Sequence, residues 1–245
     1  MRLRGHLAND CPTGDVCPRI IDTDSESVLV QGSLVTDPAV LDELDLPGHE
    51  AVIEVPRSLI YGRRIMDVGE LGAWISQHHT RDLFRLEVRD RYTVGTDGDD
   101  FQRYLNGAGQ PDAAAKQPWL ARLAADTAAG RVRRKVHLVR GPLSDYQRYE
   151  FEWGFVPNTQ AGEQIRILES DADRSAALVE VGDVFVLDAE HVLRNLYDDV
   201  GRFLGAHVVY GGEAVAIRAM IDWIWEAAEP FTQWWERHPE FHRDR

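Results

Sequence analysis

The stretch Val132–Trp153, VRRKVHLVRGPLSDYQRYEFEW, decides the fold class of this chain. Its first part, Val132–Arg140, has the apolar content and length of a strand. Ser144 then stands three residues before Gln147, which is the spacing of a capping box at the start of a helix. We therefore predict a strand followed by a helix over residues 144–153, with Ser144 as the N-cap.

A strand is the local alternative for the second half of this stretch. Tyr149, Phe151 and Trp153 alternate with charged residues, as the residues of a half-buried strand do. We prefer the helix because the capping box fits and a strand has already ended at Arg140. Ile165–Leu168 is then a second strand, and the strand-helix-strand connection predicts a parallel pair.

The pattern outside this unit predicts an α/β fold with a mixed sheet. Towards the N-terminus we expect helices and strands in the order helix 68–78, strand 84–92, short helix 101–105, exposed loop 106–116 and helix 118–129. Towards the C-terminus we expect an antiparallel meander over residues 183–187, 192–197 and 202–210, and then an amphipathic helix over 212–228.

Residues 1–66 have a different character and predict a small β-rich module. The chain to about Asp10 looks unstructured, and Arg19–Val35 resembles a hairpin. Asp37 and Pro38 are typical of a helix start, and Glu50–Val55 of a strand. We expect this β-β-α-β module to pack on a second domain, residues 67–245.

Composition limits the function classes. The 245 residues carry a net charge of −14, which argues against direct electrostatic binding of nucleic acid and favours a basic protein partner. The sequence has no apolar run of about 18 residues and no apolar segment typical of a signal peptide, so we expect no membrane association. Only Cys11 and Cys17 are cysteines. A cytoplasmic location is the expectation.

Four blocks together resemble an uncharacterised actinobacterial domain family. They are RLEVRDRY (85–92), LSDYQRYE (143–150), AGEQIRIL (161–168) and GRFLGA (201–206), within a resemblance over residues 67–228. Members of that family are encoded near helix-turn-helix regulators, so the resemblance implies a cytoplasmic, regulator-associated protein. The residues before these blocks look like a short leader module found in the same setting. The resemblance supplies no catalytic residues.

A ligand site is predicted where the helix at Ser144 begins, because open α/β sheets bind ligands at the carboxyl ends of their strands. The candidate binding residues are Ser144, Asp145, Arg148, Glu150, Glu163 and Arg166. A structural network of ion pairs is the alternative for the same charges.

A degenerate phospholipase-D-like half is the alternative fold and site. His191 and Asp198 have the spacing of that superfamily's H-x-K-x4-D motif. Leu193 stands where the motif has lysine, and Arg194 comes one residue late. A turn histidine and a turn aspartate explain the same residues without catalysis.

Metal and cofactor sites find little support. His6, Cys11 and Cys17 lack the spacing and the fourth ligand of a zinc site, and the adjacent His78 and His79 would point in different directions. Neither a dinucleotide-binding nor a P-loop glycine motif is present. We expect no metal and no cofactor.

Two further features bear on partners. Arg131–Lys135 is a basic run that the end of the preceding helix explains. Tryptophans 223, 225, 234 and 235 exceed what one helix face buries, which indicates a homodimer or protein-partner surface. The function we expect is a non-catalytic regulatory or adaptor protein that reaches DNA only through a DNA-binding partner and has a small-molecule pocket. The alternative is an enzyme of phosphodiester or small-molecule transfer with its site near His191.

Overall fold

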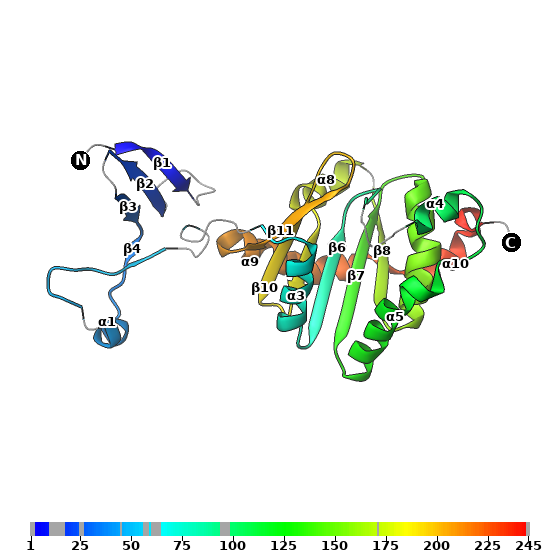
Figure 1. Cartoon of the computed structure of the whole chain (residues 1–245), viewed down its shortest axis with the longest axis horizontal. Coiled ribbons are helices and arrows are strands. Elements are labelled where there is room, and N and C mark those ends of the chain that lie inside the picture. Colours follow the sequence, from blue (N-terminus) through cyan, green and yellow to red (C-terminus); the bar gives the residue numbers. More distant parts are fainter. Residues whose placement is uncertain are drawn as a thin grey trace. The chain divides into compact units, whose positions relative to one another are not determined.

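The structure is a computed structural model that describes residues 3–9, 18–24, 27–44, 46–55, 59, 65–93, 99–170 and 172–243. The chain divides into two compact units, Met1–Arg64 and Ile65–Arg245 (Figure 1). Among the described residues, no helix combines the length and apolar character that crossing a membrane requires.

The N-terminal unit contains a three-stranded antiparallel sheet, in the order β1 (Leu3–Asn9), β2 (Arg19–Thr23) and β3 (Val28–Gln31). The hairpin expected from the sequence is confirmed in β2 and β3. The expectation that the chain to about Asp10 is unstructured was wrong, because β1 pairs with β2. This pairing satisfies the backbone N–H and C=O groups of β1, and the polar side chains of the segment did not indicate it.

The same unit contains a short helix between two paired segments. The helix α1 (Pro38–Leu44) begins after Asp37, whose carboxylate accepts a hydrogen bond from the Ala39 N–H at 3.0 Å. The two-residue strands β4 (Ser33–Leu34) and β5 (Ile53–Glu54) pair antiparallel on either side of α1. The predicted N-cap and helix are confirmed.

The second unit is built on a seven-stranded mixed sheet. Its strand order is β11 (Phe203–Val209), β10 (His191–Tyr197), β9 (Val184–Leu187), β6 (Asp82–Glu87), β7 (Val132–Val139), β8 (Gln164–Glu169) and β12 (Glu229–Pro230). The strands β6, β7 and β8 are mutually parallel, and every other neighbouring pair is antiparallel. The predicted parallel pair and antiparallel meander are both confirmed.

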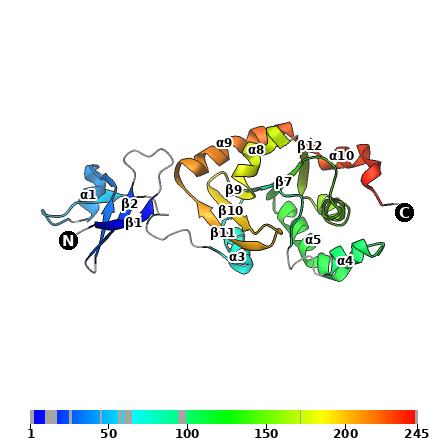
Figure 2. The same cartoon turned by 90° about the horizontal axis from the view of Figure 1, so that it is seen from above.

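Helices cover the two faces of this sheet (Figure 2). One face carries α3 (Val68–His78), α4 (Asp100–Leu105) and α5 (Ala113–Ala128), and the other carries α8 (Ala172–Val181) and α9 (Gly211–Ala227). The last helix, α10 (Phe231–Arg237), follows β12. The polypeptide between β7 and β8 is one continuous helical segment, in which α6 (Asp145–Tyr149), a π-helical turn η2 (Glu150–Phe155) and α7 (Val156–Gln160) follow one another. The helix expected over residues 144–153 is therefore confirmed, and the local strand alternative was wrong.

Packing follows the alternation of side chains along the strands. On the α8–α9 face, Phe84, Val136 and Val186 lie in one buried cluster with Ile217 and Ile221 of α9. On the opposite face, apolar side chains form three clusters, one under α3, one where η2 meets α10, and one of aromatic rings between α4 and η2. Polar strand residues fill the space between these three clusters.

Three expectations in this unit were wrong. The helix α5 starts at Ala113 because the Asp112 carboxylate accepts hydrogen bonds from two N–H groups of its first turn, so residues expected in an exposed loop are helical. The helix α8 was not expected at all. Val68 has the helical spacing that predicts the buried face of α3 together with Leu71 and Ile75, but it is 64% exposed.

The tryptophans at the C-terminal end are distributed unequally. Trp234 is 1% exposed and stacks on Phe241, whereas Trp223 is 62% exposed on α9. Trp223 is thus a tryptophan that the fold leaves exposed, as expected from the sequence, whereas Trp234 belongs to the core.

Candidate functional site

An open cleft of about 530 Å³ lies at the carboxyl ends of β6 and β7. It is lined by Val88, Arg89, Asp90, Arg91, Arg140, Val179, Gly182, Asp183, Asn195, Tyr197, Asp199, Val200 and Gly201. This is the edge at which open α/β sheets bind ligands. The lining comes from the segments that follow β6 and β7, from the start of β9 and from the end of β10.

The wall of the cleft is held in place by backbone contacts between distant segments. The Thr93 N–H donates to the Gly201 carbonyl at 2.8 Å. Gly201 has a φ of 81°, and a Cβ at this position would lie 2.7 Å from the Arg91 carbonyl oxygen. The close approach of these two segments therefore requires glycine.

Two buried side chains in this wall, Asp183 and Asn195, present oxygens without a hydrogen-bond partner. Asp183 is 2% exposed and Asn195 is 7% exposed. Asp183 Oδ1 accepts from the Val88 N–H at 3.1 Å, and the Tyr92 hydroxyl bonds to the same carboxylate. Asp183 Oδ2 makes no well-oriented hydrogen bond, and neither does Asn195 Oδ1. Burial, and then the negative charge of Glu87, raise the pKa of Asp183.

Three arginines of the lining have their guanidinium groups near carbonyl oxygens or aromatic rings. Arg140 Nη2 donates to Asp90 Oδ2 at 3.1 Å, while its buried Nε has no partner. Arg89 Nη2 donates to the Asp198 carbonyl at 2.8 Å and lies over the Tyr197 ring. Arg91 lies over the Phe101 ring. The cleft thus offers both unpaired acceptors and cationic donors.

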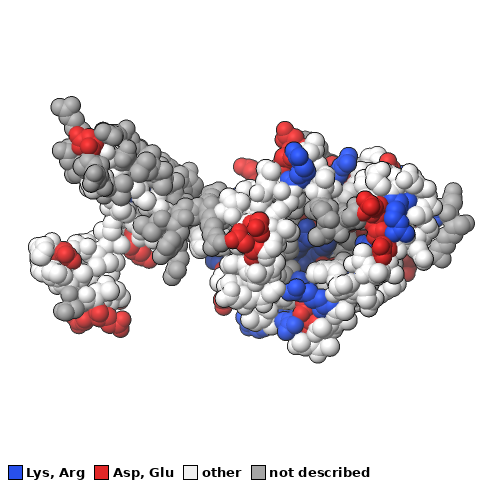
Figure 3. Space-filling model, in the orientation of Figure 1, with Lys and Arg blue, Asp and Glu red and all other residues white. Residues whose placement is uncertain are grey.

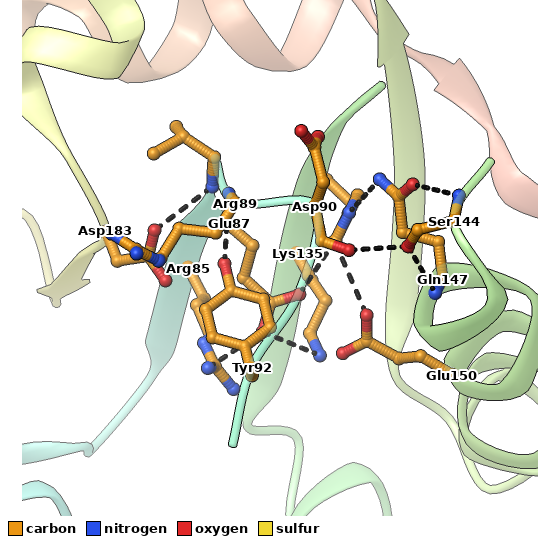
Figure 4. A network of polar contacts seen from close by, with 12 residues as sticks. Arg85, Glu87, Arg89, Asp90, Tyr92, Lys135, Ser144, Gln147, Glu150 and Asp183 are labelled. Carbon is orange, nitrogen blue, oxygen red and sulfur yellow. Dashed lines mark hydrogen bonds and ion pairs between the residues drawn. The ribbon is translucent and has the colours of Figure 1, made fainter. Parts of the chain in front are cut away.

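A buried network of charges, the polar cluster, adjoins the cleft (Figure 4). We define it as Arg85, Glu87, Lys135, His137, Gln147 and Glu150. Glu87 is 1% exposed, and its Oε1 lies 2.8 Å from Arg85 Nη2 and 3.4 Å from Lys135 Nζ. Burial opposes ionisation of Glu87, but Arg85 and then Lys135 outweigh it and hold the pKa well below its usual range.

The surface above this region is hollowed. Figure 3 shows Lys and Arg atoms in and around a hollow on the face that carries α3 and α5. The side chain of Arg85 is 27% exposed, whereas that of Glu87 is 1% exposed. The cationic partner is therefore the one that meets solvent.

The capping box at the start of α6 fixes the proton of His137. Gln147 Oε1 accepts from the Ser144 N–H at 3.0 Å, so the Gln147 amide nitrogen faces His137 Nε2 at 3.3 Å. Nε2 therefore accepts, and the imidazole proton lies on Nδ1. Nδ1 is 3.2 Å from Glu87 Oε2, to which it donates.

Glu150 brings a second carboxylate to the same imidazole. Its Oε2 lies 3.8 Å from His137 Nδ1 and has no hydrogen-bond partner. Burial, and then the negative charge of Glu87, raise the pKa of Glu150 to about 7. Glu150 is the first residue of η2, and π-helical turns often occur at functional sites.

Glu87, His137 and Glu150 offer a set of donor atoms that a metal ion could use. One ligand atom from each lies within 4.8 Å of the others. However, a metal on Nδ1 would displace the proton that the Gln147 amide orientation places there, and Arg85 and Lys135 already supply positive charge to Glu87. These residues fit proton sharing better than metal ligation. Of the cysteines and histidine considered for zinc, Cys11 and Cys17 lie outside the described residues.

The structure does not bring the six ligand-binding candidates together. Ser144 donates its hydroxyl to the Asp90 carbonyl at 2.6 Å, Glu150 joins the polar cluster, and Asp145 is exposed in the first turn of α6. The guanidinium of Arg148 lies over the Phe241 ring. Ser144 and Glu150 are therefore beside the site, and Arg148 contacts the C-terminal segment.

Glu163 and Arg166 lie elsewhere. Glu163 precedes β8, at the amino end of a parallel strand, and accepts from Asn158 Nδ2 at 2.8 Å. Arg166 points to the other face of the sheet, where it donates to the Trp225 carbonyl at 2.7 Å. The prediction missed this separation because it placed residues by their order along the chain. It did not specify which residues of β8 point to which face of the sheet.

The alternative site is also divided. His191 begins β10 and Asp198 follows its last residue, so a strand of roughly 20 Å separates them. Arg194 pairs with Glu213 of α9, and Asp198 pairs with Arg202. The His191 ring contacts the rings of Trp74 and His78. Within one chain these residues do not form a phosphodiesterase half-site.

Sequence reasoning missed most of the buried polar residues. Arg85 and Glu87 alternate with apolar residues, a pattern that predicts a half-buried strand with these two side chains on its solvent face. Because β6 is central in the sheet, both of its faces are covered. The available signal was the same alternation of polar and apolar residues on the neighbouring strand β7, where Lys135 and His137 pair in register with Arg85 and Glu87.

Comparison with known proteins gives a family but no activity. The sequence model of a family described as Domain of unknown function (DUF6879) matches residues 70–236. No curated protein shows significant sequence similarity to the chain.

Proposed function

Since this chain belongs to the DUF6879 family, whose description names no activity, we propose from its site that it is a non-catalytic regulatory protein that binds a small polar molecule. The observation that carries the proposal is the pair of unpartnered oxygens, Asp183 Oδ2 and Asn195 Oδ1, in the wall of an open cleft. Buried polar atoms without partners are uncommon in folded proteins, and a ligand is one explanation for them.

The size and position of the cleft support binding. Its volume of about 530 Å³ lies within the range of small-molecule sites. Leaving a buried acceptor unpaired costs about 1–3 kcal/mol, which a ligand that donates a hydrogen bond would recover. Asp183 and Asn195 thus favour a bound state over an empty one.

A binding role is favoured over catalysis by the arrangement of the titratable groups. Glu87 and His137 contact each other in the interior, and neither lines the cleft. Glu150 faces the same imidazole. A general acid or base must reach the substrate directly or through one water, which Glu87, His137 and Glu150 do not offer. Asp183 does line the cleft with a raised pKa, and we assign it to binding as an acceptor for the ligand.

A regulatory role with a DNA-binding partner is supported by charge and by resemblance. The net charge of −14 favours a basic protein partner. The blocks at residues 85–92 and 143–150 resemble an actinobacterial family encoded beside helix-turn-helix regulators. We propose that the chain acts in the cytoplasm and reaches DNA through such a regulator. Affinity capture with the tagged full-length chain tests this, and recovery of no helix-turn-helix protein would contradict it.

Small-molecule binding is tested by amide chemical-shift mapping of the full chain. A panel of amino acids, organic acids, amines and phosphate esters is added at millimolar concentration. We expect at least one class to shift amides of the cleft lining, and Asn195→Leu to weaken that response. Asp222→Asn, an exposed change on α9, is the matched control that should leave it unchanged. A panel that shifts no cleft amide would refute the proposal.

A further inference from the structure

The deep part of the cleft is an acceptor site. Asp183 is oriented by the hydrogen bond from the Val88 N–H, and Asn195 by the contact of its Nδ2 with the Tyr197 hydroxyl at 3.4 Å. In each side chain the remaining oxygen has no partner. Two acceptors on side chains that are at most 7% exposed are complementary to a group that donates more than one hydrogen bond.

A protonated amine matches this acceptor site better than a neutral donor. An ammonium group donates three hydrogen bonds and carries the positive charge that a buried carboxylate needs. Asp183 also lies close enough to Glu87 for the two negative charges to oppose each other, and this repulsion is larger than the attraction that Arg85 exerts on Asp183. A cation beside Asp183 relieves that repulsion, whereas an anion there would increase it.

A different part of the same lining is a donor site. Arg140 Nε is buried and has no partner, while Nη2 of the same guanidinium is held by Asp90 and by the Val88 carbonyl. Arg89 and Arg91 also line the cleft. Guanidinium groups bind carboxylates through paired hydrogen bonds, so this part is complementary to an acidic group.

Resting on the proposed function, we infer that the ligand of the cleft is a zwitterion that places a protonated amine at Asp183 and Asn195 and a carboxylate at Arg140. Amino-acid-like molecules have this chemistry. A ligand with only one of the two charges would leave either the acceptors or the arginine unpaired.

Three compounds of equal chain length separate these contributions. Aminohexanoate carries both groups, hexanoate only the acid and hexylamine only the amine. Titrated into the full chain by calorimetry, aminohexanoate should bind about tenfold or more tighter than either of the others, as expected for one charged hydrogen-bonded contact. Aminobutanoate and aminooctanoate extend the series, because the best spacing of the two charges is part of the measurement.

Two substitutions test which residue binds the amine of the ligand and which binds its carboxylate. Asp183→Asn should remove the advantage of aminohexanoate over hexanoate, and Arg140→Gln should remove its advantage over hexylamine. Asp222→Asn should change neither ratio. Circular dichroism verifies that each variant folds. If Asp183→Asn does not fold, Asn195→Leu replaces it, with the same expected loss of the amine contribution.

Several outcomes would overturn the inference. They are equal binding of hexanoate and aminohexanoate, equal binding of hexylamine and aminohexanoate, and the absence of binding across the whole series. Failure of the proposed function is distinguishable, because it requires that the broader panel shifts no cleft amide. A cleft that binds only anions or only amines would keep the proposed function and refute the zwitterion.

Discussion

Replacement of Glu150 by glutamine should make the chain more stable at neutral and alkaline pH. Burial, and then the charge of Glu87, raise the pKa of Glu150 from 4.5 to about 7. The folded chain therefore holds a proton at Glu150 between these two pH values that the unfolded chain has lost. Its stability falls as the pH rises through this window and stays lower above it.

The magnitude follows from the size of this pKa difference. At about 1.4 kcal/mol per unit, the rise from 4.5 to about 7 is worth about 3 kcal/mol of unfolding free energy. Glu150→Gln keeps the shape of the side chain and removes the ionisation. The difference in stability between variant and wild type should therefore move in favour of the variant by up to about 3 kcal/mol between pH 4.5 and pH 8.

Urea unfolding followed by tryptophan fluorescence measures this difference at each pH. Glu226→Gln, an exposed change on α9, controls for the loss of one negative charge from an acidic chain, and it should show little dependence on pH. A difference for Glu150→Gln that is constant from pH 4.5 to pH 8 would show that this carboxyl ionises in the fold as it does in water.

Three further predictions concern a buried ion pair, a glycine beside the cleft and the tryptophans at the C-terminal end. Glu87→Gln leaves the buried Lys135 and the partly exposed Arg85 without their partner and should cost about 3 kcal/mol in unfolding free energy, measured by urea denaturation; a loss below 1 kcal/mol would contradict the ion-pair geometry. Gly201→Ala should destabilise by about 2 kcal/mol more than Gly182→Ala, because both have positive φ but only Gly201 lacks room for a Cβ; equal melting temperatures would disprove this. Trp234→Ala should cost about 3–5 kcal/mol and Trp223→Ala less than about 0.5 kcal/mol, and similar losses would mean that the 1% and 62% exposures do not describe the protein in solution.

The sequence predicted the parts of the fold that depend on local chemistry. The capping box at Ser144 and Gln147 located a helix, and the apolar runs at residues 183–187 and 192–197 located two meander strands. Helix α8 was not predicted because its ten residues, Ala172–Val181, include only three large apolar side chains, Leu178, Val179 and Val181. Strand β1 was not predicted because its structure depends on pairing with β2 and not on its own composition.

The candidate site was less predictable for a geometric reason. Which side chains come into contact depends on the order of the strands in the sheet and on the face of the sheet to which each side chain points. Glu87 and His137 are 50 residues apart in sequence, yet β6 and β7 are neighbours and both residues point to the same face. Ser144 and Glu150 were found because they lie on one helix. Asp183 and Asn195 were missed because they come from strands whose neighbours the sequence did not reveal.

The two outermost strands of the large sheet affect how copies of this protein meet one another. At one side, β12 contributes only Glu229 and Pro230, and proline has no N–H to offer a further strand. At the other side, Met66 forms an isolated bridge to Ala206 of β11. Short or proline-containing edges discourage the addition of strands from other molecules. The β12 border is therefore a poor template for a further strand, whereas on the other border the bridge from Met66 covers one residue of the seven in β11.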